Sequence, residues 1–118
     1  MNNWERMKAG RLYNADSKDL EKYHSFGMET CDKFNRTPLW RKKRKQRLLE
    51  KLIPSAKDGG AAIFAPFYCE YGVNIHFGKG CFVNYKCTFL DCAPITLEDG
   101  VWVGANVTIA TPCHPFLS

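Results

Sequence analysis

The chain has 118 residues, enough for one domain or part of one, and it is 45% hydrophobic and 25% charged. Its formal net charge is +5 at pH 7. No apolar run is long enough to span a bilayer, and the first residues lack the apolar region of a secretory signal. We therefore expect a cytoplasmic protein without a membrane partner.

Residues 1–60 are predicted to form a helical region. Asp16 or Ser17 can cap a helix that runs toward Phe34. A spacing of three and four residues predicts that one face of this helix carries Leu20, Tyr23, His24 and Met28, so we expect His24 to pack within the helical region.

A second helix is predicted after Thr37-Pro38, which combines a capping residue with a proline suited to the first helical position. It should run from Leu39 to about Ile53 and end at Pro54. Residues 55–60 have the composition of a linker.

The positive charge is concentrated in Arg41-Lys42-Lys43-Arg44-Lys45. Such a run can bind nucleic acid, but it is also typical of the solvated face of a helix. No nucleic-acid module follows the run and no aromatic residues are interleaved with it, so we favour the solvated face and expect no nucleic-acid partner.

After residue 60 apolar residues recur at a six-residue period. One series is Ile63, Cys69, Ile75, Cys81 and Cys87, and it continues after one step of eight at Ile95, Val101 and Val107. A second apolar series lies two positions after the first, from Ala65 to Ile109. Residues i and i+2 of a strand point to the same side. The double series therefore predicts short strands, one per hexapeptide, with both series facing a common interior.

Three hexapeptides close one coil of a parallel β-helix, a repeat architecture in which successive coils stack. Residues 61–118 would form about three coils of 18 residues, with a two-residue insertion near Cys92-Ala93-Pro94. Unrelated strands of an all-β sandwich are the alternative, which the two interleaved series disfavour. The predicted fold class is mainly β, with the helical region as an N-terminal cap.

The six cysteines contain no C-x-x-C pair, so no metal site is predicted. Several cysteines fall on the repeat and have the size of small core residues. We expect all six thiols to be free.

Several segments together resemble the maltose and galactoside O-acetyltransferases, a family of hexapeptide-repeat acyltransferases. In the cap region the resemblance is carried by Met7-Lys8-Ala9-Gly10-Arg11-Leu12-Tyr13 and Phe34-Asn35. In the repeat region it is carried, in the family's order, by residues 71–78, 83–85, 89–91, 104–107 and Thr111-Pro112-Cys113-His114-Pro115. The resemblance implies a left-handed coil, a homotrimer with active sites between subunits, and acetyl transfer from acetyl-CoA to a sugar hydroxyl.

The resemblance also implies roles for individual residues. His114 matches the catalytic histidine, and a histidine can remove a hydroxyl proton at neutral pH. The residues that match the family's acceptor pocket are Asp16, Glu70, Asn84 and Asp91. As alternatives, Asn84 and Asp91 could serve only as turn residues and Asp16 only as a helix cap. His76 follows Ile75 and is expected to point outward.

The family continues with further coils that hold most contacts to acetyl-CoA, so we expect the cofactor site beyond Ser118 and this chain to be truncated at its C-terminus. Two functions remain open. The chain is an acetyl-CoA-dependent sugar O-acetyltransferase of the maltose, glucose or galactoside type, or the N-terminal part of one. Alternatively, it is an inactive remnant that serves as an oligomerisation or binding module.

Overall fold

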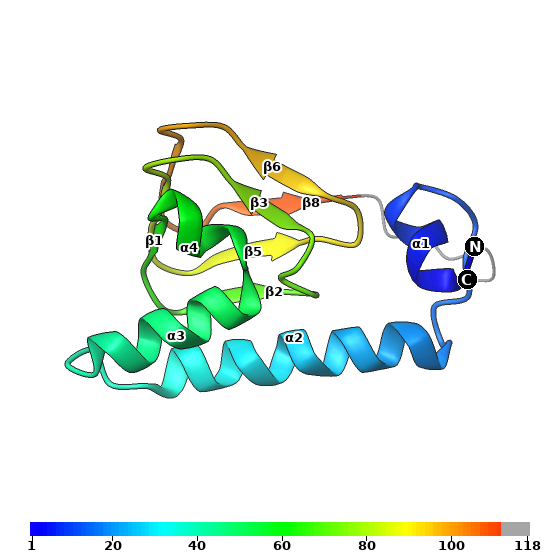
Figure 1. The fold of residues 1–118 in the computed structure, drawn as a ribbon, viewed down its shortest axis with the longest axis horizontal. Helices are drawn as coiled ribbons and strands as arrows, with labels where there is room; N and C mark the ends of the chain where they lie inside the picture. Colours follow the sequence, from blue (N-terminus) through cyan, green and yellow to red (C-terminus); the bar gives the residue numbers. More distant parts are fainter. Residues whose placement is uncertain (112–118) are drawn as a thin grey trace.

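The computed structural model describes residues 1–111. Within them, helices come first and short strands follow (Figure 1). The helices are α1 (Asn3–Lys8), α2 (Lys18–Arg36), α3 (Lys42–Leu52) and α4 (Ser55–Gly59). The strands are β1 (Ala62–Ile63), β2 (Phe67–Cys69), β3 (Ile75–Phe77), β4 (Phe82–Val83), β5 (Cys87–Leu90), β6 (Ile95–Leu97), β7 (Trp102–Val103) and β8 (Thr108–Ala110).

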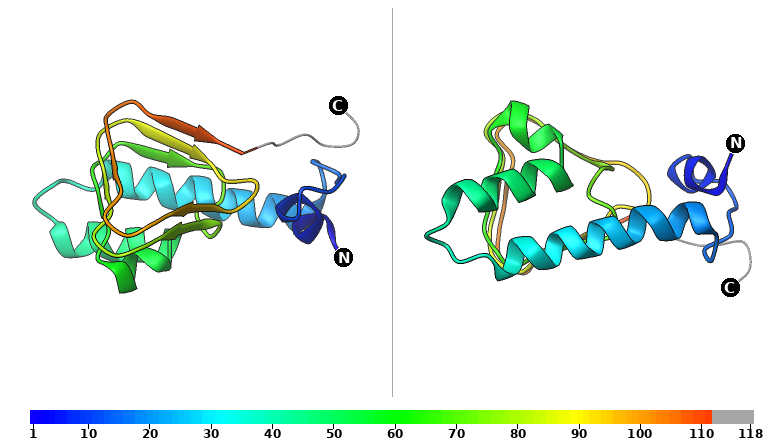
Figure 2. Two further views of the ribbon diagram at one scale, coloured as in Figure 1. Left: turned by 90° about the horizontal axis from the view of Figure 1, so that it is seen from above. Right: turned by 60° about the horizontal axis from the view of Figure 1, so that its bottom comes forward.

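The strands form three parallel sheets with the orders β1-β4-β7, β2-β5-β8 and β3-β6. The chain visits the sheets in turn, and Figure 2 shows the successive coils stacked as a triangle. The predicted stack of parallel strands is confirmed. The described residues contain two full coils and two strands of a third.

The length of a coil differs from the prediction. Every paired residue lies 20 positions further along the chain, as in Ala62–Phe82 and Phe82–Trp102, so a coil has 20 residues and not 18. The two extra residues lie at the corner between β2 and β3 and recur between β5 and β6. The first insertion escaped notice because side chains alternate with a period of two, so two added residues leave the inward face unchanged.

Inward side chains of successive coils fill the interior of the triangle. The strands β2, β3 and β6 each alternate between buried, exposed and buried residues. Phe67 and Phe89 pack edge to face in neighbouring coils, with ring centroids 5.3 Å apart. Both side chains are fully buried. Burying a side chain of this size stabilises a fold by about 1.5–3 kcal/mol, so these layers are a main source of stability.

The helix α2 begins after Ser17, as predicted, but buries a different face. Leu20 is buried as expected, whereas Tyr23 and Met28 are exposed. The other buried positions are Gly27, Thr30, Cys31 and Phe34. A β-carbon at Gly27 would lie 2.5 Å from the Glu70 carbonyl oxygen, so glycine lets the helix approach the corner that follows β2.

The helix α3 begins at Lys42, three residues later than predicted, because Thr37 closes the preceding helix. The Thr37 hydroxyl and its backbone N–H both donate to the Lys33 carbonyl. The Lys45 ammonium donates to the carbonyls of Phe34 and Thr37, at 2.9 and 3.2 Å. These bonds satisfy carbonyls that the end of a helix leaves free. The predicted linker also holds a short helix, α4.

Two side chains of the helical region bind the free edge of the first coil. The Asn35 amide donates to the Phe67 carbonyl and accepts from the Phe67 N–H, at 2.9 and 2.8 Å. The Ser55 hydroxyl donates to the Ile75 carbonyl and accepts from the Phe77 N–H, at 3.1 and 2.9 Å. Asn35 and Ser55 thus occupy places that a neighbouring strand would take, which blunts an edge open to further pairing.

The cysteines differ in part from the prediction. Cys31, Cys69, Cys81 and Cys87 carry free thiols, but Cys92 is disulfide-bonded, so the expectation of six free thiols is wrong there. Spacing alone did not reveal this bond because disulfide geometry depends on the fold. Cys113 lies outside the described residues. No helix in the described part of the chain is long and apolar enough to cross a membrane.

Candidate functional site

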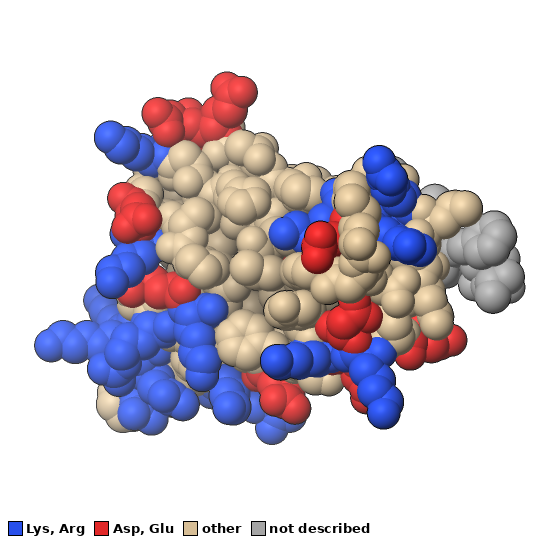
Figure 3. Space-filling model, turned by 45° about the vertical axis from the view of Figure 1, so that its right-hand side comes forward, with Lys and Arg blue, Asp and Glu red and all other residues tan. Residues whose placement is uncertain are grey.

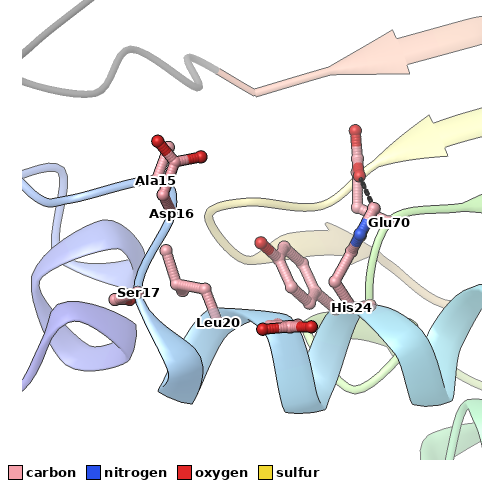
Figure 4. Close-up of a pocket in the computed structure, with 8 residues that line it drawn as sticks. Ala15, Asp16, Ser17, Leu20, His24 and Glu70 are labelled. Carbon is pink, nitrogen blue, oxygen red and sulfur yellow. Dashed lines mark hydrogen bonds and ion pairs between the residues drawn. The ribbon is translucent and has the colours of Figure 1, made fainter.

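A pocket of about 320 Å³ lies between the start of α2 and the corner that follows β2. Asp16, on the loop before α2, stands on one side, and Glu70, on the corner, stands on the other (Figure 4). The remaining lining residues are Ala15, Ser17, Leu20, Glu21, His24 and Tyr71. Two of the four predicted acceptor-binding residues, Asp16 and Glu70, therefore share one cavity.

Local hydrogen bonds hold the loop that carries Asp16. The Asp16 N–H donates to Oδ1 of Asn14 at 3.0 Å, which is the bond of an Asx turn. The next residue, Ser17, donates to Oδ1 of Asp19 at 2.5 Å, and Oδ2 of Asp19 accepts from the Trp4 N–H of α1 at 2.9 Å. The Ser17 hydroxyl lowers the pKa of Asp19, so this carboxylate stays ionised at neutral pH. The Asp16 side chain itself is exposed at the rim.

His24 is the residue that sequence reasoning placed incorrectly. It was expected to pack within the helical region, yet its Nε2 lies 2.6 Å from Oε2 of Glu70, on the corner that follows β2. The pair is partly accessible, with 40% of the His24 and 29% of the Glu70 side chain exposed. The two groups form a hydrogen bond, and both remain within reach of a bound molecule. The spacing of His24 from Leu20 predicted a packed position on the helix, but it could not identify Glu70 as the partner of His24.

Two phenols lie close to the pair. Tyr71 lines the pocket beside Glu70, and its ring packs against Trp4 with centroids 4.9 Å apart. Burial, with the nearby charge of Glu70, raises the pKa of both Tyr71 and Tyr13. Both phenols are therefore protonated at neutral pH, and the Tyr71 hydroxyl can donate to a polar ligand.

Asp91 lies behind the pocket wall. It is fully buried, and its carboxylate accepts backbone N–H groups from the corner beneath it. The donors are Glu70, Tyr71, Gly72 and Asn74, at 2.8–3.3 Å. Burial raises the pKa of Asp91 to about 6, although the backbone donors act in the opposite direction. The side chain does not line the pocket in this chain, but it fixes the segment on which Glu70 and Tyr71 stand.

The remaining predicted residues lie elsewhere. Asn84 is half-buried at the corner after β4, where its Oδ1 accepts from the Tyr85 N–H at 2.8 Å, and it does not line the pocket. His76 is exposed on β3, as expected. His114 lies outside the described residues.

The pocket thus combines three carboxylates, an imidazole and a phenol with the apolar side chain of Leu20. Hydroxyl groups both donate and accept hydrogen bonds, so a cavity with both kinds of partner suits a ligand rich in hydroxyls. In the described residues no group of three histidine, cysteine, aspartate or glutamate side chains is placed to hold a metal ion. The lining side chains offer hydrogen bonds to such a ligand.

Comparison with known proteins places this geometry in context. Residues 6–57 match the family described as the maltose acetyltransferase hexapeptide capping motif. A solved maltose O-acetyltransferase from Clostridium difficile 630 superimposes with a TM-score of 0.90 at 32% identity, over 98% of this chain and 62% of that one. The galactoside O-acetyltransferase of Lactococcus lactis is 30% identical over 98% of this chain and 56% of its own length. The chain is similar in sequence and fold to these maltose and galactoside O-acetyltransferases.

A further solved structure is a hexapeptide-repeat acetyltransferase from Vibrio cholerae in complex with acetyl-CoA, with a TM-score of 0.75 at 26% identity. It matches 92% of this chain and 57% of the solved chain. The chain thus spans somewhat more than half the length of these acetyltransferase relatives. The matched capping motif contains Asp16 and His24, whereas Glu70 and Tyr71 belong to the coils. The pocket therefore lies where the capping motif meets the repeat.

Proposed function

We propose that the chain forms part of an acetyl-CoA-dependent O-acetyltransferase that acts on a sugar hydroxyl of the maltose, glucose or galactoside type. One observation carries the proposal. A pocket with carboxylates on both sides lies at the junction of the capping motif and a coil related to sugar O-acetyltransferases. We also propose that the coils wind left-handed and that the protein acts in the cytoplasm.

Asp16 and Glu70 would bind the hydroxyls of the acceptor sugar. A carboxylate accepts from a hydroxyl, and such charge-assisted bonds are stronger than bonds between neutral groups. Because His24 holds Oε2 of Glu70, the other oxygen of that carboxylate is the one we assign to the sugar. Tyr71 would donate to a sugar oxygen. Asp91 would support binding through the corner that it fixes, and Asn84 remains a proposed acceptor contact on grounds of family resemblance.

His114 is the proposed general base. A sugar hydroxyl is a poor nucleophile at neutral pH, so its proton must leave as the oxygen attacks the thioester carbonyl of acetyl-CoA. The new C–O bond forms, the C–S bond breaks, and the proton taken by the base returns to the departing thiolate of CoA. Acetyl-CoA is the proposed co-substrate, in keeping with the complex of the Vibrio cholerae relative.

The test is an assay of thiol release from acetyl-CoA with a panel of sugars. It is run on this chain and on this chain joined to the C-terminal coils of the Clostridium difficile relative. In the joined chain His114→Ala should lower turnover by roughly 10²–10⁴-fold, the usual contribution of a general base. Asp16→Asn and Glu70→Gln should instead raise the sugar concentration needed for half-maximal rate. Asp58→Asn, at an exposed carboxylate of α4, is the control. Unchanged turnover in His114→Ala would contradict the assigned base.

A role in self-assembly is a second candidate, favoured by aromatic side chains on the outer face of the β1-β4-β7 sheet. Phe82 of β4 contacts Phe64 and Trp102 of the neighbouring coils, with ring centroids 4.9 and 5.9 Å apart. Trp102 is 77% exposed. We propose that this face is covered in a homotrimer, and sedimentation should report three chains. The variant Trp102→Glu should then sediment as a smaller species, because it places a charge in the interface.

A further inference from the structure

The connection between α2 and α3 carries two large apolar side chains in open solvent. Leu39 and Trp40 are 78% and 79% exposed, higher values than those of the other exposed large apolar side chains described. They stand at the end of the molecule, where α2 and α3 meet (Figure 1). Basic residues follow directly, and we call residues 39–44 with Arg47 the basic tip.

The basic tip lies in a surface region of one sign of charge. No acidic residue occurs between Asp32 and Glu50 in the sequence. Figure 3 shows Lys and Arg side chains gathered at the lower left, where α3 and the end of α2 lie. The exposed cations of the basic tip are Arg41, Lys42, Lys43, Arg44 and Arg47. The region is therefore complementary to an anionic surface.

Lys45 belongs to the same run of basic residues, but its side chain has contacts within the fold. It is partly buried, donates to two carbonyls at the end of α2, and lies 4.3 Å from the centroid of the Phe34 ring. Lys45 thus has a structural role. The exposed cations of the basic tip have no comparable contact to a described carbonyl or carboxylate, so the fold does not require them.

The cations also oppose the helix that carries them. The first turn of α3 has no acidic residue and begins with Lys42, Lys43 and Arg44. The N-terminal end of a helix carries partial positive charge, so cationic side chains there are unfavourable for the helix. An anionic surface beside the tip would remove this repulsion.

We propose that the basic tip docks the protein on an anionic phospholipid bilayer, with Leu39 and Trp40 inserted at the level of the headgroups. Tryptophan and leucine beside lysine and arginine are the composition of segments that bind at membrane interfaces. Each basic residue near an anionic membrane adds to the electrostatic attraction between protein and lipid. This attraction acts only within about a Debye length of the membrane surface. Binding of a nucleic acid would use the cations but gives Leu39 no role. The expectation of no membrane partner rested on the lack of an apolar run that could span a bilayer, and binding at the bilayer surface does not need such a run.

Sedimentation with vesicles tests the proposal. The chain should bind vesicles of equal parts phosphatidylglycerol and phosphatidylcholine and dissociate from them at high salt. It should not bind vesicles of pure phosphatidylcholine. Replacing Lys42 and Lys43 by alanine should weaken partitioning roughly 25-fold, about fivefold for each charge lost. The double variant Leu39→Ser, Trp40→Ser keeps all the charges, but its partitioning onto the anionic vesicles should be at least tenfold weaker.

Matched controls separate the tip from general charge and apolarity. Lys57 and Lys79 are exposed on other elements, and their joint replacement by alanine should change binding less than threefold. Leu12 is 60% exposed outside the tip, and Leu12→Ser should bind normally. Circular dichroism checks that each variant is folded. Equal loss in the controls, equal binding to neutral vesicles, or tighter binding to a single-stranded RNA than to anionic vesicles would overturn the proposal.

Discussion

The helical region and the coils both supply hydrogen-bond partners to the backbone groups at strand edges, but they do so in different ways. In the coils each strand edge is met by the backbone of the next coil, through a register that repeats every 20 residues. At the edge of the first coil the partners are single side chains of the helical region. Asn35 of α2 binds β2, and Ser55 of α4 binds β3. A repeat distributes its stability over many equivalent bonds, whereas the cap concentrates it in a few side chains. Substitutions should therefore act differently in the two regions.

The largest effect is expected for a charge placed inside the coils. Phe77 points inward on β3, and Phe77→Asp should prevent stable folding, at a cost of about 4–5 kcal/mol or more, because the carboxylate is buried without a partner. The neighbouring His76 points outward, and His76→Asp should change the free energy of unfolding by less than about 0.5 kcal/mol. Urea denaturation followed by circular dichroism measures both. Similar losses in the two variants would show that the alternation is wrong.

Next in size is the loss of a carboxylate that fastens one coil to the coil beneath it. Asp91→Asn replaces an oxygen that accepts buried N–H groups by a donor, and should cost about 3 kcal/mol. Asp99 makes the analogous bond to the Lys79 N–H at 2.7 Å, but on the exposed surface. Asp99→Asn should cost less than about 1 kcal/mol, since water can replace the lost partner. Thermal unfolding should rank the two variants in that order.

A loss of about 2 kcal/mol is expected when Asn35 is replaced by alanine, because the Phe67 N–H and carbonyl both lose their partner. Asp32 lies on the same helix, exposed and paired with the exposed Arg36, and Asp32→Ala should cost less than about 0.5 kcal/mol. Amide hydrogen exchange gives a second readout. Protection of the Phe67 amide should fall in Asn35→Ala, and unchanged protection would contradict the edge-capping role.

The smallest effect is expected at Ser55, whose hydroxyl serves two backbone groups of β3 that are only partly buried. Ser55→Ala should cost about 1 kcal/mol, close to the net value of one hydrogen bond. Lys57→Ala, on the exposed side of the same short helix, is the matched control. Chemical denaturation can resolve the difference. Equal stability of the two variants would show that the Ser55 hydrogen bonds do not stabilise the fold.

The same contrast explains what the sequence revealed. The repeat was predictable because inward positions must be apolar over many strands, and Phe77, Val83 and Phe89 all obey that demand. The 20-residue period was missed because apolarity reports only the side that a residue faces, and two extra residues preserve it. In the cap, the start of α2 was predictable from Ser17, but the start of α3 depended on contacts of Thr37 and Lys45 that no local pattern reveals.

The pocket was predictable only in part for a related reason. Asp16 and Glu70 were chosen through resemblance, and the structure brings them together. The pairing of His24 with Glu70 joins residues 46 positions apart, and spacing along a helix carries no information at that range. Asp91 was chosen as an acceptor contact, but the structure shows its carboxylate occupied by backbone N–H groups. The role of His114 stays a prediction, since this residue lies outside the described residues.

The extended corner offers a way to reshape the pocket without rebuilding the fold. Residues 70–74 carry Glu70 and Tyr71, yet they lie between strands that keep the same inward face whenever the corner gains or loses an even number of residues. Insertions or deletions of two residues there would alter the cavity wall while every strand kept its pairing. The constraint is that the corner is tied to Asp91 in the next coil. Changes in acceptor preference among relatives should therefore appear as paired changes, one in the corner and one a full coil later.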